Sequence, residues 1–540
     1  MLRHRVSRGF AFIEVLIAAC LIMIMACILL PTSKSNFRDL AVSAQKDEPT
    51  TTTAPSDFVE LLTPAPPASP RINGPRVVGC RPGHPFIFRI PTTGQRPMTF
   101  AADHLPPGLM LDSASGIITG SCATAGEWIA SLTATNSRGQ ATGRLRIACG
   151  DTLALTPPMG FNDWYAFYDR VTDETMRHAA EILVSSGMAD VGYQYVNIDD
   201  CWAFAPSNRD KDRVGPLRDE KGNILPNRHF PDMKGLTDYI HVRGLRAGIY
   251  TSPGPLTCAR FTGSWQHEAQ DARQFADWGF DFLKYDWCSY SRVLNHKPTL
   301  EELKRPYALM GRLLRQQPRD IVFNLCQYGM GNVWEWGGDV DGNSWRTADD
   351  LGLAGLSKIF DIALTSTNLR AYARPGQWND PDYIQIGLIG SARQMGKPHP
   401  APLTATEEYA FMSLWCLSAS PLFYSGDIEH LDPLTINVLT NPEVINVDQD
   451  PLGQPARVVQ ITDKSFILIK NMEDGSKAIG FANRGTIPIT LSADWPTLGL
   501  NGKQTARDLW RQKDLGTSEG QFLAEVPPHG VLLLQLRPAN

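Results

Sequence analysis

An alternation of strand-like apolar runs and amphipathic helical segments over residues 155–446 limits the folds open to this chain. Such an alternation is typical of βα units that build a parallel sheet. Eight strand-like runs can be counted, at residues 158–161, 193–198, 245–250, 280–285, 321–325, 343–347, near Gln377 and at 421–424. Eight strands in about 290 residues predict a (β/α)8 TIM barrel.

The 540 residues are too many for one compact core, so we expect further folded units on both sides of the barrel. Short alternating runs and turn residues precede it, and a second set of alternating runs follows it. The predicted multidomain organisation is a membrane anchor or signal segment at 1–31, a Pro/Thr/Ala-rich linker at 32–70, a β-sandwich at 71–150, the barrel at 151–446 and a C-terminal antiparallel β-sandwich at 447–540. Within 71–150, the segments 105–112, 115–120 and 134–139 resemble an Ig-like module.

The first residues have the composition of a membrane segment. Arg3, Arg5 and Arg8 precede an apolar run at 10–30, which is long enough to cross a bilayer and is interrupted by Glu14. The stretch 8–17 resembles a type IV prepilin signal, with cleavage after Gly9. An uncleaved signal anchor or a secretory signal peptide is the alternative. Each reading places the rest of the chain outward, in the periplasm or at the cell surface, either membrane-anchored or secreted after processing.

Composition and motifs exclude several classes of function. The net charge of −5 and the absence of a Lys/Arg cluster argue against nucleic acid as a partner. The sequence has no C-x-x-C pair, no phosphate-binding Gly-rich loop and no His pair beside its acidic clusters. We therefore expect neither a cofactor nor a metal. The sequence leaves the oligomeric state open.

Acidic residues follow four of the predicted strands. They are Asp199-Asp200, Asp286, Asp349-Asp350 and the pair Asp380 and Asp382. In a barrel the carboxyl ends of the strands meet at one face, so these side chains are expected to converge. Several converging carboxylates suit acid/base chemistry on a sugar or a hard metal ion.

Five ordered motifs then resemble glycoside hydrolase family 27, the α-galactosidase or melibiase type. They lie at residues 156–162, 197–202, 284–288, 344–350 and 378–382, and a matching segment follows at 446–453. The resemblance implies a retaining double displacement with Asp286 as nucleophile and Asp350 as general acid/base. Retention in turn implies carboxyl groups roughly 5 to 5.5 Å apart. Lys284 is expected to help keep Asp286 ionised, and burial of Asp350 near Asp286 to strengthen its hold on a proton.

The same resemblance implies a set of sugar-binding residues. Asp199 and Asp200 would bind hydroxyls at C4 and C6 and Lys284 those at C3 and C4, while Arg346 and Asp382 would hold the C2 side. Trp164 would form an apolar wall and Tyr250 would line the site. Gln327 lies in the segment that replaces the family's Cys-Glu-Trp, and it is expected to bind substrate near the C2 hydroxyl. Tyr383 stands where the family usually has Met.

Some positions stay open at this point. Asp349 stands where many family members have Gly or Ala, so the acid/base assignment is ambiguous by one residue, although alignment on Trp345-Arg346 favours Asp350. The resemblance implies a disulfide between Cys258 and Cys288. Three further cysteines lie in the Ig-like region and cannot all pair there: Cys80, Cys122 and Cys149. Cys201 has no obvious partner and its pairing stays open, whereas Cys326 and Cys416 are expected as buried thiols.

The expected function is that of an exo-glycosidase that removes terminal α-D-galactose from oligosaccharides or polysaccharides. A relative acting on α-N-acetylgalactosamine, β-L-arabinopyranose or isomaltose units is the alternative within the enzyme class. A surface carbohydrate-binding protein that has lost turnover is the alternative outside it. The Ig-like module is interpreted as a spacer.

Overall fold

The computed structural model describes residues 60–352, 355–390 and 398–539. The predicted membrane segment, the prepilin-like motif and most of the linker therefore lie outside the described residues. Within the described ranges, no helix combines the length and the apolar character needed to cross a bilayer.

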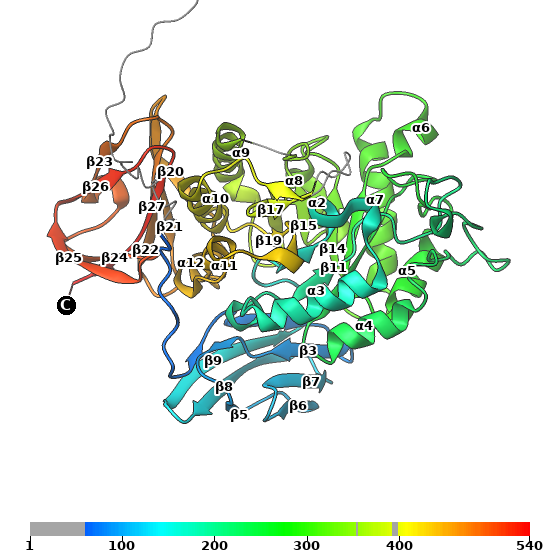
Figure 1. Cartoon of the computed structure of the whole chain (residues 1–540), viewed down its shortest axis with the longest axis horizontal. Helices are drawn as coiled ribbons and strands as arrows, with labels where there is room; N and C mark the ends of the chain where they lie inside the picture. The colour runs from blue at the N-terminus through cyan, green and yellow to red at the C-terminus, as the bar shows by residue number, and fades with distance from the viewer. Residues whose placement is uncertain (1–59, 353–354, 391–397, 540) are drawn as a thin grey trace, which may run out of the picture. The chain divides into compact units, whose positions relative to one another are not determined.

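Eight parallel strands form the central sheet (Figure 1). In their spatial order they are β16 (Trp378–Asp380), β15 (Ser344–Arg346), β14 (Val322–Cys326), β13 (Phe282–Asp286), β12 (Arg246–Thr251), β11 (Tyr195–Asn197), β10 (Met159–Asn162) and β19 (Leu422–Tyr424). An isolated parallel bridge between Ile384 and Tyr424 joins the chain after β16 to β19. The predicted barrel is confirmed, and its strand order follows the sequence, with the last strand, β19, beside the first, β10.

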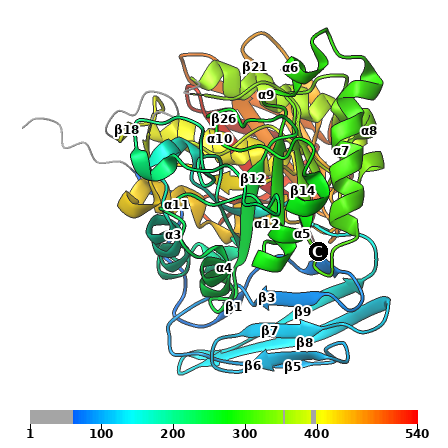
Figure 2. The same cartoon turned by 90° about the vertical axis from the view of Figure 1, so that its right-hand side faces the viewer.

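Helices surround this sheet (Figure 2). The longer ones are α3 (Asp173–Ser185), α4 (Met233–His241), α5 (Glu268–Trp278), α7 (Leu300–Arg315), α9 (Leu356–Asn368), α10 (Ala405–Leu417), α11 (Pro433–Leu439) and α12 (Pro442–Asp448), and short ones are α2 (Trp164–Phe167), α6 (Tyr290–Leu294) and α8 (Val333–Trp336). Helix α3 shows how the local sequence determines where a helix begins and which of its faces is buried. Thr172 caps it by accepting from the Thr175 amide, and its apolar face is buried at Met176, Ala179, Ala180 and Leu183.

The Ig-like module consists of two main sheets and a short pair. The sheets are β2 (Val77–Cys80), β9 (Gly139–Cys149), β8 (Gly126–Asn136) and β5 (Thr99–Asp103), then β3 (Pro85–Arg89), β7 (Ile117–Ser121) and β6 (Leu109–Asp112), with β1 (Arg71–Ile72) paired to β4 (Thr92–Thr93). In β8, Ala130, Leu132 and Ala134 are buried while Ile129 and Ser131 are exposed, as the alternation predicts. Cys80, Cys122 and Cys149 are buried free thiols in this module.

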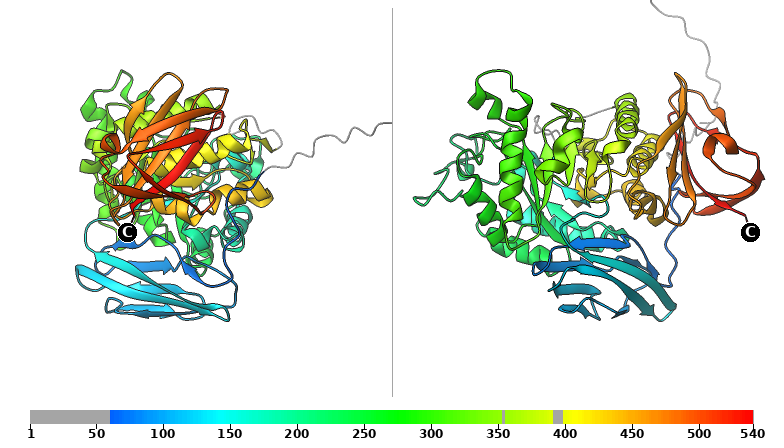
Figure 3. Two further views of the ribbon diagram at one scale, coloured as in Figure 1. Left: turned by 90° about the vertical axis from the view of Figure 1, so that its left-hand side faces the viewer. Right: turned by 180° about the vertical axis from the view of Figure 1, so that it is seen from behind.

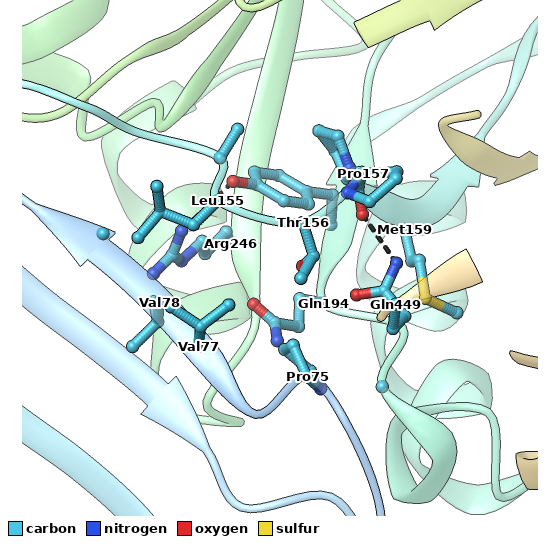
Figure 4. A pocket seen from close by; sticks show the side chains of 15 residues that line it. Pro75, Val77, Val78, Leu155, Thr156, Pro157, Met159, Gln194, Arg246 and Gln449 are labelled. Carbon is cyan, nitrogen blue, oxygen red and sulfur yellow. Dashed lines mark hydrogen bonds between the residues drawn. The ribbon is translucent and has the colours of Figure 1, made fainter. Parts of the chain in front are cut away.

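The module contacts the barrel where the barrel strands begin. Arg246, the first residue of β12, donates hydrogen bonds to the carbonyl of Ile87 at 3.0 Å and to the Tyr195 hydroxyl at 3.1 Å. A small cavity of about 40 Å³ lies beside this contact, between β2 and the residues that lead into β10 (Figure 4). Because it lies at the start of the strands, this cavity is at the opposite end of the barrel from the predicted catalytic carboxylates.

The C-terminal domain is an antiparallel β-sandwich, as predicted. One sheet contains β20 (Arg457–Ile461), β21 (Ser465–Asn471), β22 (Lys477–Asn483), β27 (Val531–Pro538), β24 (Lys503–Asp508) and β25 (Lys513–Glu519), and a second pairs β23 (Ile489–Asp494) with β26 (Gln521–Val526). Its larger sheet packs on α10 of the barrel through β22 and β27 (Figure 3). This contact surrounds α10 with protein, which explains why the nine apolar and small residues from Tyr409 to Leu417 are buried all round the helix rather than on one face.

Candidate active site

The polar residues singled out from the sequence lie at the carboxyl ends of the barrel strands. Asp199 and Asp200 follow β11, Asp286 ends β13, Arg346 ends β15, and Asp382 comes two residues after β16. Since all these strands are parallel, their ends share one face of the barrel. Hydrogen bonds and ion pairs join most of these side chains into two groups, one around Asp199 and one around Arg346.

Asp199 is the centre of the first group. Its Oδ2 atom accepts hydrogen bonds from Lys284 Nζ at 2.9 Å, Asn162 Nδ2 at 2.9 Å and the Tyr383 hydroxyl at 3.0 Å. Burial lowers the pKa of Lys284, but the negative charge of Asp199 together with Tyr383 and Asp286 outweighs it and places the pKa well above its ordinary value. Lys284 is therefore a fixed cation at the bottom of the site.

Asp200 points to a different set of partners. Its carboxylate accepts from the Ala259 amide at 2.8 Å and from the Cys201 amide at 2.7 Å. Burial raises the pKa of Asp200 to about 7, although these backbone donors act in the opposite direction. The adjacent carboxyls of Asp199 and Asp200 thus differ in environment: one pairs with an ammonium group and the other only with neutral donors.

Asp286 is buried and is held by two phenols. Tyr250 donates to Oδ2 at 3.1 Å and Tyr328 donates to Oδ1 at 2.5 Å. Burial raises the pKa of Asp286 to about 6, against the lowering effect of the Lys284 cation and of the Tyr328 hydroxyl. The expected influence of Lys284 on this carboxylate is therefore present, and it acts without direct contact because Lys284 is bonded to Asp199.

A disulfide lies against the same carboxylate. The structure joins Cys258 to Cys288, which is two residues after Asp286. The Tyr250 hydroxyl is 3.5 Å from the Cys288 sulfur, and the Tyr328 hydroxyl is 3.7 Å from that of Cys258. The disulfide therefore packs beside both phenols that bond to Asp286.

Arg346 and Asp382 form the second group. Their side chains are buried and 3.1 Å apart, and Arg346 also donates to Asp350 Oδ1 at 3.3 Å. Burial raises the pKa of Asp382, while Arg346 lowers it. Asp382 has a φ of 97°, a conformation that few residues other than glycine adopt, and its Oδ2 accepts from the Leu351 amide at 2.7 Å. These bonds tie the end of β16 to the loop that carries Asp350.

Asp350 differs from its expected environment. The side chain was expected to be buried, but it is 48% exposed and bonds to a guanidinium group. The reason is its place on an irregular loop beyond β15 rather than on the strand itself. The carboxyl group of Asp350 is therefore open to solvent in this structure. Asp349 is also exposed, and among the described residues only Asp350 of the two contacts Arg346.

Two further predicted residues have local roles in this structure. Gln327 is fully buried, and its amide donates to the Met330 carbonyl at 2.8 Å within the turn after β14. Trp164 is half-buried at the start of α2 and packs edge-on against Tyr168, with 4.8 Å between the ring centres. Their predicted contacts with sugar stay predictions.

Sequence reasoning did not assign Asn162, Tyr328 or Tyr383 to the site, although each bonds to one of its two central carboxylates, Asp199 or Asp286. Asn162 and Tyr383 stand inside or beside motifs that were recognised. Tyr328 follows Gln327 directly. The signal that could have found all three is their position at the carboxyl end of a barrel strand, the same criterion that found the acids.

The donor set favours a polar organic ligand over a metal ion. Among the described residues, one group able to offer three metal ligands includes Asp286, but its other members are the sulfurs of the disulfide. Another contains Asp210, Asp212 and His229, away from the barrel motifs and with both acids exposed. The inner carboxylate oxygens already accept from ammonium, amide and phenol groups, which suits the exchange of hydrogen bonds with sugar hydroxyls.

The barrel presents a buried carboxylate that is the candidate nucleophile and a second carboxyl group on a loop, and Asp, Lys and Arg side chains surround them. This is the organisation of a glycoside hydrolase. The comparisons with known proteins define the family. Residues 156–450 match the family described as Alpha galactosidase A, and 462–536 match the Alpha galactosidase C-terminal beta sandwich domain. Residues 69–149 match the "Putative Ig domain". The chain belongs to the Alpha galactosidase A family.

Individual relatives agree with this assignment. The chain is 36% identical over 398 residues to an α-galactosidase of Oryza sativa subsp. japonica, which covers 73% of this chain and 87% of the rice protein. A Bacteroides fragilis structure described as a "putative alpha-galactosidase/melibiase" is 34% identical with a TM-score of 0.79, covering 88% of this chain and 99% of that one. A β-L-arabinopyranosidase of Geobacillus stearothermophilus is 25% identical with a TM-score of 0.63, covering 72% and 98%.

Proposed function

We propose that this chain is a retaining exo-glycosidase that hydrolyses terminal α-D-galactosides. The observation that carries the proposal is the environment of Asp286, a buried carboxylate fixed by two phenols at the end of β13 in a chain of this family. The α-galactosidase relatives support the choice of sugar. No cofactor is needed for this chemistry, because two carboxyl groups can perform both steps.

The first step forms a covalent intermediate. The Asp286 carboxylate attacks the anomeric carbon, the bond from that carbon to the leaving oxygen breaks, and Asp350 gives its proton to that oxygen. Lys284 supports this step since its positive charge favours the ionised form of Asp286. The partly exposed position of Asp350 leaves room for a leaving group of variable size.

The second step releases the sugar with its original configuration. Water attacks the anomeric carbon, Asp350 accepts the proton of that water, and the bond to Asp286 breaks to regenerate its carboxylate. Two inversions give net retention. Asp199, Asp200, Lys284, Arg346 and Asp382 are proposed to hold the sugar hydroxyls during both steps.

The identity of the sugar is open to one specific alternative. The Geobacillus β-L-arabinopyranosidase shares the fold, and L-arabinopyranose resembles galactose without the carbon-6 hydroxymethyl group. We assign α-galactose because the relatives with the higher identity are α-galactosidases. A panel of nitrophenyl glycosides, including α-N-acetylgalactosaminide and β-L-arabinopyranoside, compares these substrates directly.

Labelling with a mechanism-based fluoro-galactoside tests catalysis by Asp286. The expected result is a stable adduct on the peptide that contains Asp286, found by mass spectrometry, and no adduct in the Asp286→Asn variant. A surface protein that binds carbohydrate without turnover would form no adduct. An adduct on another carboxylate would overturn the assignment of Asp286.

We also propose that the apolar run at 10–30 tethers the enzyme to a membrane with its barrel facing outward. The positive residues before the run support this orientation. Fractionation of cells that express the full chain tests it: the protein should remain with membranes after a carbonate wash, and removal of residues 1–31 should release it. Mass spectrometry of the mature N-terminus distinguishes cleavage after Gly9 from an intact anchor.

A further inference from the structure

Tyr328 contacts the proposed nucleophile from a neighbouring strand. It follows β14 by two residues, and its hydroxyl donates to Asp286 Oδ1 at 2.5 Å, the shorter of the two phenol bonds to that carboxylate. Hydrogen bonds to an ionised acceptor are shorter and stronger than those between neutral groups. The Tyr328 hydroxyl donates to this carboxylate and so favours its ionised form, which lowers the pKa of Asp286.

The backbone at Tyr328 is held in an uncommon conformation. Its φ is 63°, in the left-handed region that residues other than glycine rarely adopt, and the following Gly329 has a φ of 80°. Backbone of this kind persists where the surroundings fix it, and it is concentrated at functional sites. Here the turn directs a phenol from the end of β14 to the carboxylate at the end of β13.

The surroundings of the phenol restrict it further. The Tyr328 hydroxyl lies 3.7 Å from the Cys258 sulfur and 3.9 Å from the Cys288 sulfur. Burial raises the pKa of Tyr328 far above its ordinary value, and the negative charge of Asp286 acts in the same direction. The phenol thus keeps its proton and remains a donor throughout the pH range in which a glycosidase works.

We infer that Tyr328 is a positioning residue that keeps Asp286 ionised and aligned for attack at neutral pH. This inference rests on the proposed function, in which Asp286 is the nucleophile. Its physical basis is that a donor bonded to the charged form of a buried acid opposes the effect of burial. Tyr328 stands in the segment where the family resemblance implies Cys-Glu-Trp.

The substitution Tyr328→Phe tests the inference because it removes the hydroxyl and keeps the ring. The pKa of Asp286 should rise by about one unit, which is the size expected for losing a hydrogen bond to a charged group. The acid limb of kcat/KM should shift by the same amount to higher pH, and kcat/KM on that limb should fall about tenfold.

Tyr307→Phe is the matched control. Its hydroxyl is also buried beside β14, but it bonds to the Cys326 carbonyl at 3.4 Å and not to Asp286. This variant should leave the acid limb in place. If Tyr328→Phe lowers kcat while the limb stays at the wild-type pH, Tyr328 has a packing role only and the inference is overturned.

A titration independent of turnover separates this inference from the proposed function. Carbon-13 NMR of aspartate-labelled full-length protein follows the Asp286 carboxyl, which is identified by its loss in Asp286→Asn. A higher pKa of Asp286 in Tyr328→Phe supports the inference even if no glycoside is hydrolysed, in which case only the proposed function fails. An unchanged pKa overturns the inference whatever the activity.

Discussion

The Nζ atom of Lys284, in β13, lies 2.9 Å from Oδ2 of Asp199, which follows β11, and both side chains are buried. The two residues are 85 positions apart in the chain. Their pairing places a permanent cation between the proposed sugar-binding carboxylate and the nucleophile. The Nζ atom of Lys284 lies 5.2 Å from the centre of the Tyr250 ring and 4.9 Å from the centre of the Tyr383 ring. Both rings are close enough for cation–π interactions with this ammonium group.

Lys284→Met should abolish galactose binding and destabilise the fold by about 3 to 5 kcal/mol, because removing one partner of a buried ion pair leaves the other charge uncompensated. Calorimetric titration with galactose and urea unfolding measure the two effects. Lys477→Met is the control, because this half-buried lysine lies in the C-terminal domain, where its ammonium group donates to Asn471. Normal galactose affinity in Lys284→Met would exclude Lys284 from sugar recognition.

Asp350→Ala should lower kcat/KM by about 10² to 10⁴ for an α-galactoside with a poor leaving group, and much less for a nitrophenyl galactoside, since only the former needs a general acid. Azide should accelerate this variant and give α-galactosyl azide, because azide attacks the intermediate from the face that water uses. Steady-state kinetics and NMR of the product measure both effects. Asp349→Ala is the matched control on the same loop; the same behaviour there would move the acid/base role by one residue.

Asp286→Asn should stabilise the protein at neutral pH. The pKa of Asp286 is raised to about 6 in the folded state, so protonation favours folding, and this contribution is lost as pH rises from about 4 through 6. Replacing the acid with a neutral amide should therefore add about 3 kcal/mol to the free energy of unfolding at pH 7.5 and about 1 kcal/mol at pH 4.5. Urea unfolding of both proteins at each pH measures this difference. An equal difference at the two pH values would contradict a raised pKa for Asp286.

Reduction of the Cys258–Cys288 disulfide should lower both stability and activity. The bond closes a loop with a sequence separation of 30, which corresponds to about 3 to 4 kcal/mol in the chain-entropy account. Activity should fall as well, because the sulfurs pack against the phenols that hold Asp286. Dithiothreitol should lower the Tm of the wild type but not that of the Cys258→Ser/Cys288→Ser variant. A similar loss in both would show that reductant acts elsewhere.

The barrel could be predicted from the sequence because each buried parallel strand is a short apolar run that ends in polar residues. The run before Asp286, for example, predicted both the strand β13 and the position of its last residue at the site. The C-terminal sandwich and the Ig-like module were predictable in the same way from the two-residue period of strands such as β8. These patterns depend on local sequence alone.

The rest of the site depends on geometry that local patterns do not contain. Tyr328 reaches Asp286 because its backbone adopts a left-handed turn; its position after β14 places it at the right face of the barrel, but the sequence does not show which carboxylate its hydroxyl contacts. Asp350 follows β15 closely in sequence, which suggested burial, yet the loop turns outward and leaves its side chain half-exposed. Burial at a strand end depends on the path of the next loop, which is fixed by tertiary contacts.

The most direct test of the account is the configuration of the first sugar released from p-nitrophenyl α-galactoside by the purified full-length protein, followed by proton NMR before mutarotation. Attack by Asp286 followed by attack of water predicts that α-galactose appears first and the β anomer grows in later. If β-galactose appears first, water attacks the substrate directly, and the role assigned to Asp286 as a covalent nucleophile is wrong.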